Sequence, residues 1–248
     1  MEVFCQWKLS GRKEDERSDM NDPLLTFLGR PVEVEVTGPF FIAGLMVDLG
    51  PDVTVVFTGE QFFYIPLLHI HAVQPYRPRE DSAMDGGPEL PHEDVADPIS
   101  FRKMLMHAKG QFIEMNVTGR DSVHGCVTAI MNDYVEFYSP VFGTIYVLME
   151  HIKFIVPHTG PTAPYGLKTV PYPVHPSRLD LSRTFRQQLQ KSVGHLVVMD
   201  LGHNPDKIGM LEAADDHWAE LVRSDGSRII LNLRHVKSFA RPPGPQET

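Results

Sequence analysis

The hydrophobic pattern of the chain favours short strands with one buried and one solvated face. Apolar and acidic residues alternate over residues 32–36, which is the period of a half-buried strand. Residues 112–117 and 196–201 are the counterparts of this segment further along the chain. A short helix is predicted before each of these strands; in the third case Phe185, Leu189 and Val193 recur every four residues. The pattern therefore predicts an all-β fold with short helices.

Four further strand segments follow each of these first strands. They are rich in β-branched and aromatic residues. The second of them crosses a glycine, which inside a strand marks a bend or a bulge. A hairpin turn precedes the fourth strand, most clearly at 224–227, and a very short turn precedes the fifth. The predicted second strands are 41–49, 123–130 and 207–213, the third strands are 53–57, 134–138 and 218–222, and the fourth strands are 62–65, 144–148 and 228–231.

Capping patterns mark the start of each predicted helix. Asp22-Pro23 and Asp97-Pro98 place a carboxylate before a proline at the first helical position. Thr184 and Gln187 have the spacing of a capping box. The helices are therefore predicted to start close to these positions.

The chain contains an internal triplication, because residues 24–73, 101–156 and 185–239 align with one another. One glycine lies at the predicted C-terminal end of each helix, and a second follows 15 residues later. A histidine follows the second glycine by 25, 26 and 26 residues, and an apolar residue comes directly after it. We interpret these positions as structural anchors of the repeat: Gly29, Gly110, Gly194, Gly44, Gly125, Gly209, His69, His151 and His235.

A helix and five bent strands suggest a small closed barrel, since closure hides the strand edges of so short a sheet. The two segments that connect the repeats have linker composition. Residues 77–99 carry two arginines against seven acidic residues, and residues 158–183 carry five prolines. We predict a flexible N-terminal segment (1–21), a first unit (22–76), an acidic linker (77–97), a second unit (98–157), a Pro-rich linker (158–182), a third unit (183–240) and a tail (241–248).

Composition narrows the classes of function. The 248 residues carry a net charge of −9, whereas general nucleic-acid binders have a basic surplus. No apolar run approaches the roughly 18 residues of a membrane span, and the N-terminus has no signal-peptide pattern. Cys5 and Cys126 are too few for a disulfide scaffold or a Cys-rich zinc site, and Cys126 is expected to be a buried small hydrophobe. We expect a soluble, acidic protein synthesised in the cytoplasm.

The opening of the first repeat resembles an Sm motif. Gly29-Arg30-Pro31-Val32-Glu33-Val34 is followed by Gly44-Leu45-Met46-Val47. The resemblance implies three tandem Sm-like five-stranded small barrels, each preceded by a short α-helix. In that family an Asn after the third-strand turn and an Arg-Gly pair near the fourth strand hold uridine. Asp52, Asp133 and His217 begin the matching segments here and no Arg-Gly pair occurs, so RNA binding is not expected.

The repeats also close on related motifs: His151-Ile152-Lys153-Phe154-Ile155, His235-Val236-Lys237-Ser238-Phe239 and the weaker His69-Ile70-His71-Ala72-Val73. Together with the triplication, these motifs resemble the spore coat protein B family of endospore-forming bacteria, without its Ser/Lys-rich tail. The resemblance implies a non-enzymatic structural or assembly protein of the spore coat, with other coat proteins, and possibly further copies of itself, as partners. The alternatives are a cytoplasmic Sm-like adaptor that binds protein or RNA, and an enzyme built between the units.

Three histidines at one repeated position could together ligate a metal. The interpretation that we favour is that each caps a tight turn of its own unit, because His69, His151 and His235 belong to different units. His69 with His71, and His203 with His217, are weaker candidates for a metal site. We therefore expect no metal and no cofactor.

Catalytic interpretations are weaker than structural ones. Asp215 and Asp216, with Glu212 nearby, could perform acid–base chemistry, although adjacent turn carboxylates are more often solvated. Ser122-Val123-His124 lacks a nucleophile-elbow pattern, and no phosphate-binding glycine loop occurs. We expect no catalytic residues and no enzymatic activity.

Aromatic residues are dense in the first unit and could stack bases. That unit carries Arg30 against five acidic residues, so it would repel phosphate. We therefore favour contacts between units for these residues, which are Phe40, Phe41, Phe62, Phe63 and Tyr64.

Overall fold

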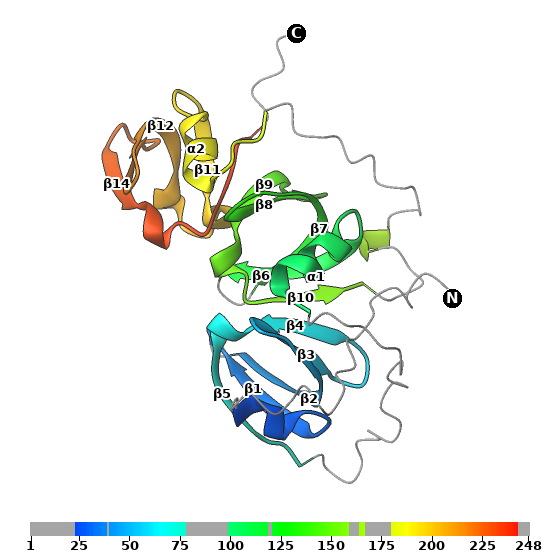
Figure 1. The fold of residues 1–248 in the computed structure, drawn as a ribbon. Helices are drawn as coiled ribbons and strands as arrows, with labels where there is room; N and C mark the ends of the chain where they lie inside the picture. The colour runs from blue at the N-terminus through cyan, green and yellow to red at the C-terminus, as the bar shows by residue number, and fades with distance from the viewer. Residues whose placement is uncertain are drawn as a thin grey trace. The chain divides into compact units, whose positions relative to one another are not determined.

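The computed structural model describes residues 23–38, 40–77, 99–118, 121–158, 164–166 and 180–242. The predicted N-terminal segment and most of the two predicted linkers and of the tail lie outside these ranges. The described residues form 15 strands and two short α-helices, with several 3-10 turns (Figure 1). This confirms the predicted class, an all-β protein with short helices. None of the helices in these ranges is long and apolar enough to cross a membrane.

Each repeat supplies five strands with the same order of turns. The first repeat contains η3 (Pro23–Phe27), β1 (Pro31–Val36), β2 (Phe40–Leu49), β3 (Val53–Phe57), β4 (Phe62–Pro66), η4 (Leu67–His69) and β5 (Ile70–Pro75). The second contains α1 (Phe101–Ala108), β6 (Phe112–Thr118), β7 (Asp121–Ile130), β8 (Tyr134–Ser139), β9 (Gly143–Leu148), η5 (Met149–His151) and β10 (Phe154–Pro157).

The third repeat has one additional feature, a pair of 3-10 turns between its first two strands. It contains α2 (Phe185–Gln190), β11 (Leu196–Met199), η7 (Asp200–Gly202), η8 (Pro205–Lys207), β12 (Ile208–Ala214), β13 (Trp218–Val222), β14 (Arg228–Asn232), η9 (Leu233–His235) and β15 (Ser238–Ala240). A further turn, η6 (Pro164–Gly166), lies before this repeat.

Contacts divide the chain into two compact units, and the division does not follow the repeats. The first unit is Met1–Ala108 with Lys153–Pro161, and the second is Lys109–Ile152 with Thr162–Thr248. The strand order is β10-β4-β3-β2-β1-β5 in the first unit and β14-β13-β12-β11-β15-β9-β8-β7-β6 in the second. The last strand of the second repeat, β10, therefore belongs to the first unit. The predicted three-unit boundaries stay a prediction.

The core of the first unit is built from alternating strand positions. Val32, Val34 and Val36 of β1 are fully buried, whereas the glutamates between them are half-buried. Phe154 and Val156 of β10 pack into the same cluster. A strand that arrives from the second repeat thus completes this core, because alternation puts Phe154 and Val156 on one face.

In the second unit, one core cluster joins the second and third repeats. Tyr134 of β8 and Tyr146 of β9 are buried against the helix residue Phe185 and the β15 residue Phe239. The ring centroids of Tyr146 and Phe239 are 4.8 Å apart, and those of Phe185 and Phe239 are 5.2 Å apart. Strand β15 also pairs with β9 through backbone hydrogen bonds. This joint therefore combines sheet pairing with aromatic packing.

One prediction about the helices is wrong, and another falls outside the described residues. The first repeat carries a 3-10 turn instead of an α-helix, and Thr26 Oγ1 donates to the Pro23 carbonyl at 2.7 Å within it. Such a local bond competes with α-helical geometry. Helix α1 is capped by Ser100, whose hydroxyl accepts the Lys103 N–H, whereas the predicted cap Asp97 lies outside the described residues.

The predicted strand 196–201 is also too long. Strand β11 ends at Met199, and Asp200 and Leu201 have positive φ angles of 50° and 60°. The Asp200 carboxylate accepts the N–H of Lys237 at 2.7 Å, which draws the chain away from the strand direction. The apolar pattern of 196–201 carries no signal for this buried carboxylate, because its partners are distant in the sequence.

Candidate functional site

The first glycine of each repeat ends the helical turn in a left-handed conformation. The φ angles of Gly29, Gly110 and Gly194 are +72°, +78° and +80°. Each of the three donates its N–H to a carbonyl of the second strand of its repeat, at 2.8 to 2.9 Å. A side chain would strain this backbone, which is why glycine recurs at this position.

The second glycine of each repeat allows two strands to approach closely. Gly44, Gly125 and Gly209 lie in β2, β7 and β12. A Cβ atom on any of them would come within 3.0 Å of a carbonyl oxygen of the next strand, from Phe57, Tyr138 or Val222 respectively. The recurring glycine is therefore explained by steric exclusion of a side chain.

The repeated histidines end the 3-10 turns that precede the last strands. His69 is buried, His151 is half-buried and His235 is exposed. The carbonyl of His69 accepts the N–H of Thr37 at 2.9 Å. Burial lowers the pKa of His151, and the positive charge of Lys237 acts in the same direction. In the described part of the chain, no three His, Cys, Asp or Glu side chains gather as they would around a metal ion.

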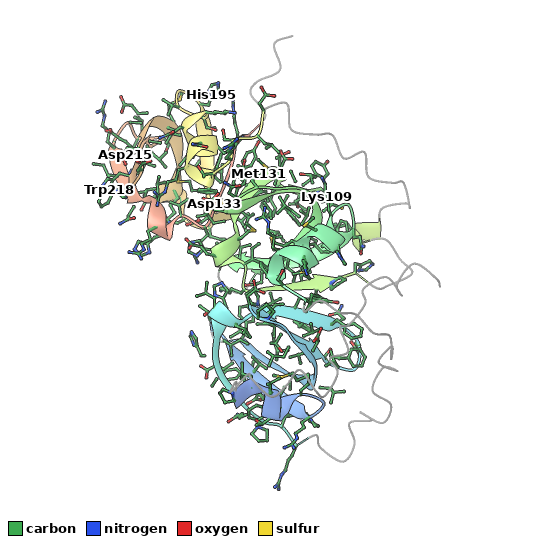
Figure 2. The ribbon with its side chains drawn as sticks, in the orientation of Figure 1. Lys109, Met131, Asp133, His195, Asp215 and Trp218 are labelled. Carbon is green, nitrogen blue, oxygen red and sulfur yellow. The ribbon has the colours of Figure 1, made fainter. Side chains whose placement is uncertain are left out.

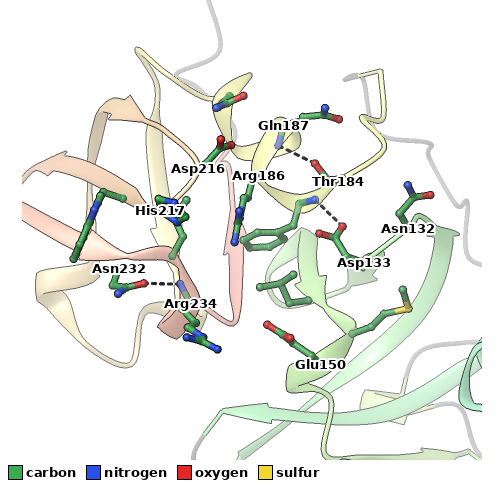
Figure 3. A pocket seen from close by; sticks show the side chains of 16 residues that line it. Asn132, Asp133, Glu150, Thr184, Arg186, Gln187, Asp216, His217, Asn232 and Arg234 are labelled. Atoms are coloured by element: carbon green, nitrogen blue, oxygen red, sulfur yellow. Dashed lines mark hydrogen bonds between the residues drawn. The ribbon is translucent and has the colours of Figure 1, made fainter. Parts of the chain in front are cut away.

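A cleft of about 1030 Å³ lies where the second repeat meets the third (Figure 3). Several of its polar side chains accept hydrogen bonds from backbone N–H groups. Asp133 Oδ1 accepts the N–H of Phe185 at 2.8 Å, and Thr184 Oγ1 accepts the N–H of Gln187 at 3.4 Å. Asn232 Oδ1 accepts the N–H of Arg234 at 2.9 Å. These groups act as caps of a helix and a turn, and the prediction that Thr184 caps a helix is confirmed.

The helix caps also connect successive repeats. Asp52, in the turn before β3, accepts the N–H of Phe101 at 2.8 Å, as Asp133 accepts that of Phe185. Each aspartate thus binds the first residue of the next repeat's helix. Sequence reasoning missed this role, although the two aspartates occupy the same repeat position and could have been recognised from that. The third repeat has His217 at this position.

A buried carboxylate ties the first and last strands of the third repeat together. Asp200 Oδ1 accepts the N–H groups of Lys237 and Ser238, at 2.7 and 3.3 Å, and Oδ2 forms an ion pair with Lys207. Removing one partner of such a group leaves a buried charge unsatisfied, which is costly. Asp200 was not among the predicted site residues, because a single aspartate within an apolar run carries no pattern.

Comparisons with known proteins place the chain in a family. A family described as YwrJ third domain matches residues 184–239, which comprise most of the third repeat. An uncharacterised protein, YwrJ of Bacillus subtilis, is 37% identical over 219 residues, covering 87% of this chain and 97% of that protein. The chain belongs to the YwrJ family. The matched third-domain segment begins at the cap Thr184 and ends at Phe239, so it contains the third-repeat side of the joint described above.

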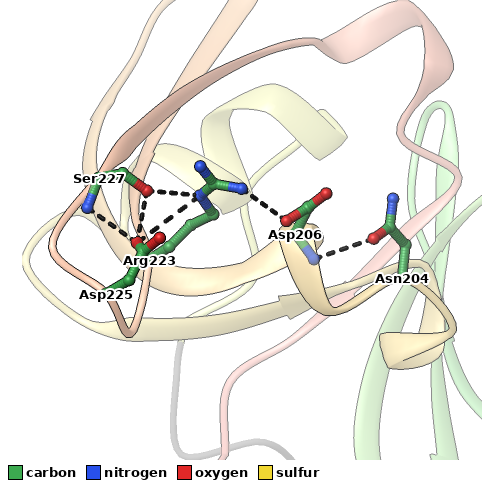
Figure 4. A network of polar contacts seen from close by, with 5 residues as sticks. All are labelled: Asn204, Asp206, Arg223, Asp225 and Ser227. Atoms are coloured by element: carbon green, nitrogen blue, oxygen red, sulfur yellow. Dashed lines mark hydrogen bonds and ion pairs between the residues drawn. The ribbon is translucent and has the colours of Figure 1, made fainter.

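A polar network holds the β13–β14 hairpin of this YwrJ-family repeat (Figure 4). Arg223 pairs with Asp206 at 2.6 Å, and its Nε donates to Ser227 Oγ at 2.9 Å. Asp225 Oδ1 accepts the Ser227 hydroxyl and also, at 2.9 Å, the Ser227 N–H, and these two bonds lower the pKa of Asp225. The predicted turn at 224–227 is present, with Gly226 in a left-handed conformation. The network fixes the turn between β13 and β14.

Strand β14 and the start of β13 present large apolar side chains to solvent in the YwrJ-family third repeat. Trp218 is 48% exposed and Ile230 is 63% exposed. Both line a shallow hollow with Ala213, Ala214 and Glu220. Trp218 lies close to Asp215 on this repeat (Figure 2). Exposed apolar side chains that line one hollow are a candidate contact site.

The remaining candidates have local roles. Asp215 Oδ1 accepts the N–H groups of His217 and Trp218 at 2.6 and 2.7 Å, which lowers its pKa. Glu212 pairs with Arg228 at 2.8 Å. Ser122 Oγ accepts from the Asn116 side chain at 3.3 Å. These groups are engaged in turns and strand pairing.

Several aromatic residues of the first repeat also make packing contacts within the fold. Phe40 and Phe63 pack on the ring of Phe154, with centroids 5.5 and 5.4 Å apart, and Tyr64 is buried. Phe41 is exposed. Two of the five therefore pack against β10, the strand that comes from the second repeat.

Proposed function

We propose that this YwrJ-family protein is a non-enzymatic structural protein of the bacterial spore coat, whose Sm-like barrels assemble through protein–protein contacts. The single observation that carries the proposal is the way in which repeats join. The last strand of a repeat pairs with the fourth strand of the preceding repeat, Ile155 opposite Tyr64 in the first unit and Phe239 opposite Tyr146 in the second. Pairing of sheet edges is a general means of joining protein modules.

The chemistry of the joint cleft supports a structural role. Asp133, Thr184 and Asn232 each accept a backbone N–H from the fold itself. A carboxylate or hydroxyl that satisfies a helix or turn terminus stabilises that terminus. The resemblance of the closing motifs to spore coat protein B directs the proposal to the spore coat.

Fractionation of sporulating cells tests the proposal. The protein is followed by quantitative mass spectrometry through soluble cytoplasm, spore core and detergent-resistant coat, with a cytoplasmic enzyme as the fractionation control. We expect enrichment in the coat fraction. Recovery in the soluble cytoplasm alone, or a host that never sporulates, contradicts the proposal.

A matched pair of variants connects the localisation to the joints. Phe239→Ala removes a fully buried ring at the joint of the second and third repeats, whereas Phe142→Ala truncates a side chain that is 46% exposed. We expect the first variant to reduce coat recovery and the second to leave it unchanged. Equal recovery of both variants contradicts assembly through an intact joint.

A further inference from the structure

The two joints within the chain use one register. Phe239 lies four residues after His235 and pairs with Tyr146, while Ile155 lies four residues after His151 and pairs with Tyr64. The pairs therefore match in repeat position. In each repeat the fourth strand also pairs with the third strand, and this pairing shows which fourth-strand residues are equivalent. Tyr64 pairs with Val55, Tyr146 with Glu136 and Ile230 with Glu220.

The third repeat has the receiving half of this joint without an occupant in the described ranges. Ile230 corresponds to Tyr146, and Trp218 corresponds to Tyr134. Tyr134 and Tyr146 are 0% and 2% exposed under the following repeat, whereas Trp218 and Ile230 are 48% and 63% exposed. Within the described residues, β14 has β13 as its one strand neighbour.

The first repeat has the inserting half of the joint. Strand β5 corresponds to β10 and β15, and within the described residues its one strand neighbour is β1. All four residues of β10 are buried, whereas four of the six residues of β5 are exposed. Val73 is the counterpart of Phe239, since it pairs with Val34 as Phe239 pairs with Met199. One chain thus carries both complementary halves.

We propose that β14 of one copy of this chain pairs antiparallel with β5 of a second copy, in the register of the two internal joints. Val73 then lies opposite Ile230, Ala72 opposite Leu231 and Gln74 opposite Ile229. The Asn232 N–H donates to the His71 carbonyl, as the Leu148 N–H donates to the Lys237 carbonyl at 3.0 Å. Trp218 and Ile230 become covered by the first repeat of the second copy.

The occupant is a second copy because the contact continues an interface that the chain already forms twice. The contact is head-to-tail, so it generates either closed rings or open chains that carry one free half at each end. His217 replaces the capping aspartate of the internal joints. The joint between copies therefore lacks the capping carboxylate of the internal joints. Because it connects separate chains, its association depends on protein concentration. This inference deepens the proposed function and rests on it for the biological role of the assembly.

Light scattering of the full chain across a range of concentrations tests the association. We expect masses that rise from 28.0 kDa to multiples of it. Ile230→Lys places a charge in the joint and should raise the dissociation constant at least about tenfold. Phe142→Lys, at another exposed apolar position, should leave it unchanged, and circular dichroism confirms that both variants fold. A chain that stays monomeric, or an association that Ile230→Lys does not weaken, overturns the proposal.

Cysteine cross-linking tests the register. In a Cys5→Ser background, a copy with Val73→Cys is mixed with a copy with Ile230→Cys and oxidised, and directly opposed residues of antiparallel strands are close enough for a disulfide. We expect a mixed covalent dimer from this pair and much less from Gln74→Cys with Ile230→Cys. Equal yields, or none from the first pair, overturn the register.

The failure of this inference is distinguishable from that of the proposed function. A self-associating protein found in the soluble cytoplasm contradicts the coat role and leaves the joint intact. A monomeric protein recovered from the coat contradicts the joint and leaves the coat role intact. Mixing the wild-type chain with a twofold excess of the Ile230→Lys variant should also shorten the assemblies, because that variant can occupy a β14 edge but cannot receive a further copy.

Discussion

Truncation of Phe239 tests the physical account of the joint between the second and third repeats. Its side chain is fully buried and lies against two rings, 4.8 Å from Tyr146 and 5.2 Å from Phe185, measured between centroids. Phe239→Ala removes the ring from this cluster while β15 keeps its backbone pairing with β9. The change therefore isolates aromatic packing from strand pairing.

The magnitude follows from burial and cavity formation. Replacing a fully buried phenylalanine by alanine costs about 3–5 kcal/mol, because transfer energy is lost and a cavity remains. This range already includes the two ring contacts of Phe239, each of which contributes about 0.5–1.5 kcal/mol beyond its buried area. We expect a loss of about 4 kcal/mol for Phe239→Ala. Phe239→Leu, which refills most of the space, should cost less than about 1.5 kcal/mol.

Urea unfolding monitored by tryptophan fluorescence measures this loss. The chain has two tryptophans, so a Trp7→Phe background leaves Trp218 of the third repeat as the single probe. With a slope of about 2 kcal/mol per molar urea, the expected loss shifts the midpoint by about 2 M. Phe142→Ala, at an exposed position, should shift it little. A loss below about 1 kcal/mol for Phe239→Ala, or equal losses at the two positions, would refute the packing argument.

Three further predictions concern single groups. Gly125→Ala should destabilise the protein by about 2 kcal/mol or more, because its Cβ would meet the Tyr138 carbonyl oxygen. Gly143→Ala has open space around it and should cost about 1 kcal/mol, because alanine is strained at the positive φ of Gly143. Chemical denaturation measures both losses, and equal losses would contradict the steric argument. Burial lowers the pKa of His151 below 6.5, so the unfolded chain binds more protons than the folded chain as the pH falls through 6.5. The free energy of unfolding should therefore drop in this range, and His151→Gln should flatten its dependence on pH. Parallel pH profiles of the two proteins would contradict this. Burial raises the pKa of Cys126 to about 11, so in a Cys5→Ser background a disulfide reagent at pH 8 should react only as the protein unfolds, and rapid labelling of the native protein would contradict this.

Several structural features follow directly from the local pattern. The alternation at 32–36 predicts which face of β1 is buried, and Val32, Val34 and Val36 are fully buried. The capping-box spacing predicts the start of α2, and Thr184 caps it. These features are predictable because strand alternation and helix capping depend on residues a few positions apart.

Other features were not predictable because they depend on contacts between distant residues. Asp200 breaks the predicted strand by accepting N–H groups 37 and 38 residues away in the sequence. Asp52 caps a helix 49 residues later. From its neighbours in the sequence alone, Asp52 is predicted to be an ordinary turn residue.

By itself, the sequence of this protein determined three copies of one strand pattern and the glycines that let the chain turn and the strands approach. Only the tertiary structure decided that β10 lies against β4 in the first unit, and that Trp218 and Ile230 are exposed where Tyr134 and Tyr146 are buried. The physical reason is that the alternation of side chains depends only on the strand itself. Which strand pairs with a given strand edge depends on which other edges the folded chain brings within hydrogen-bonding distance.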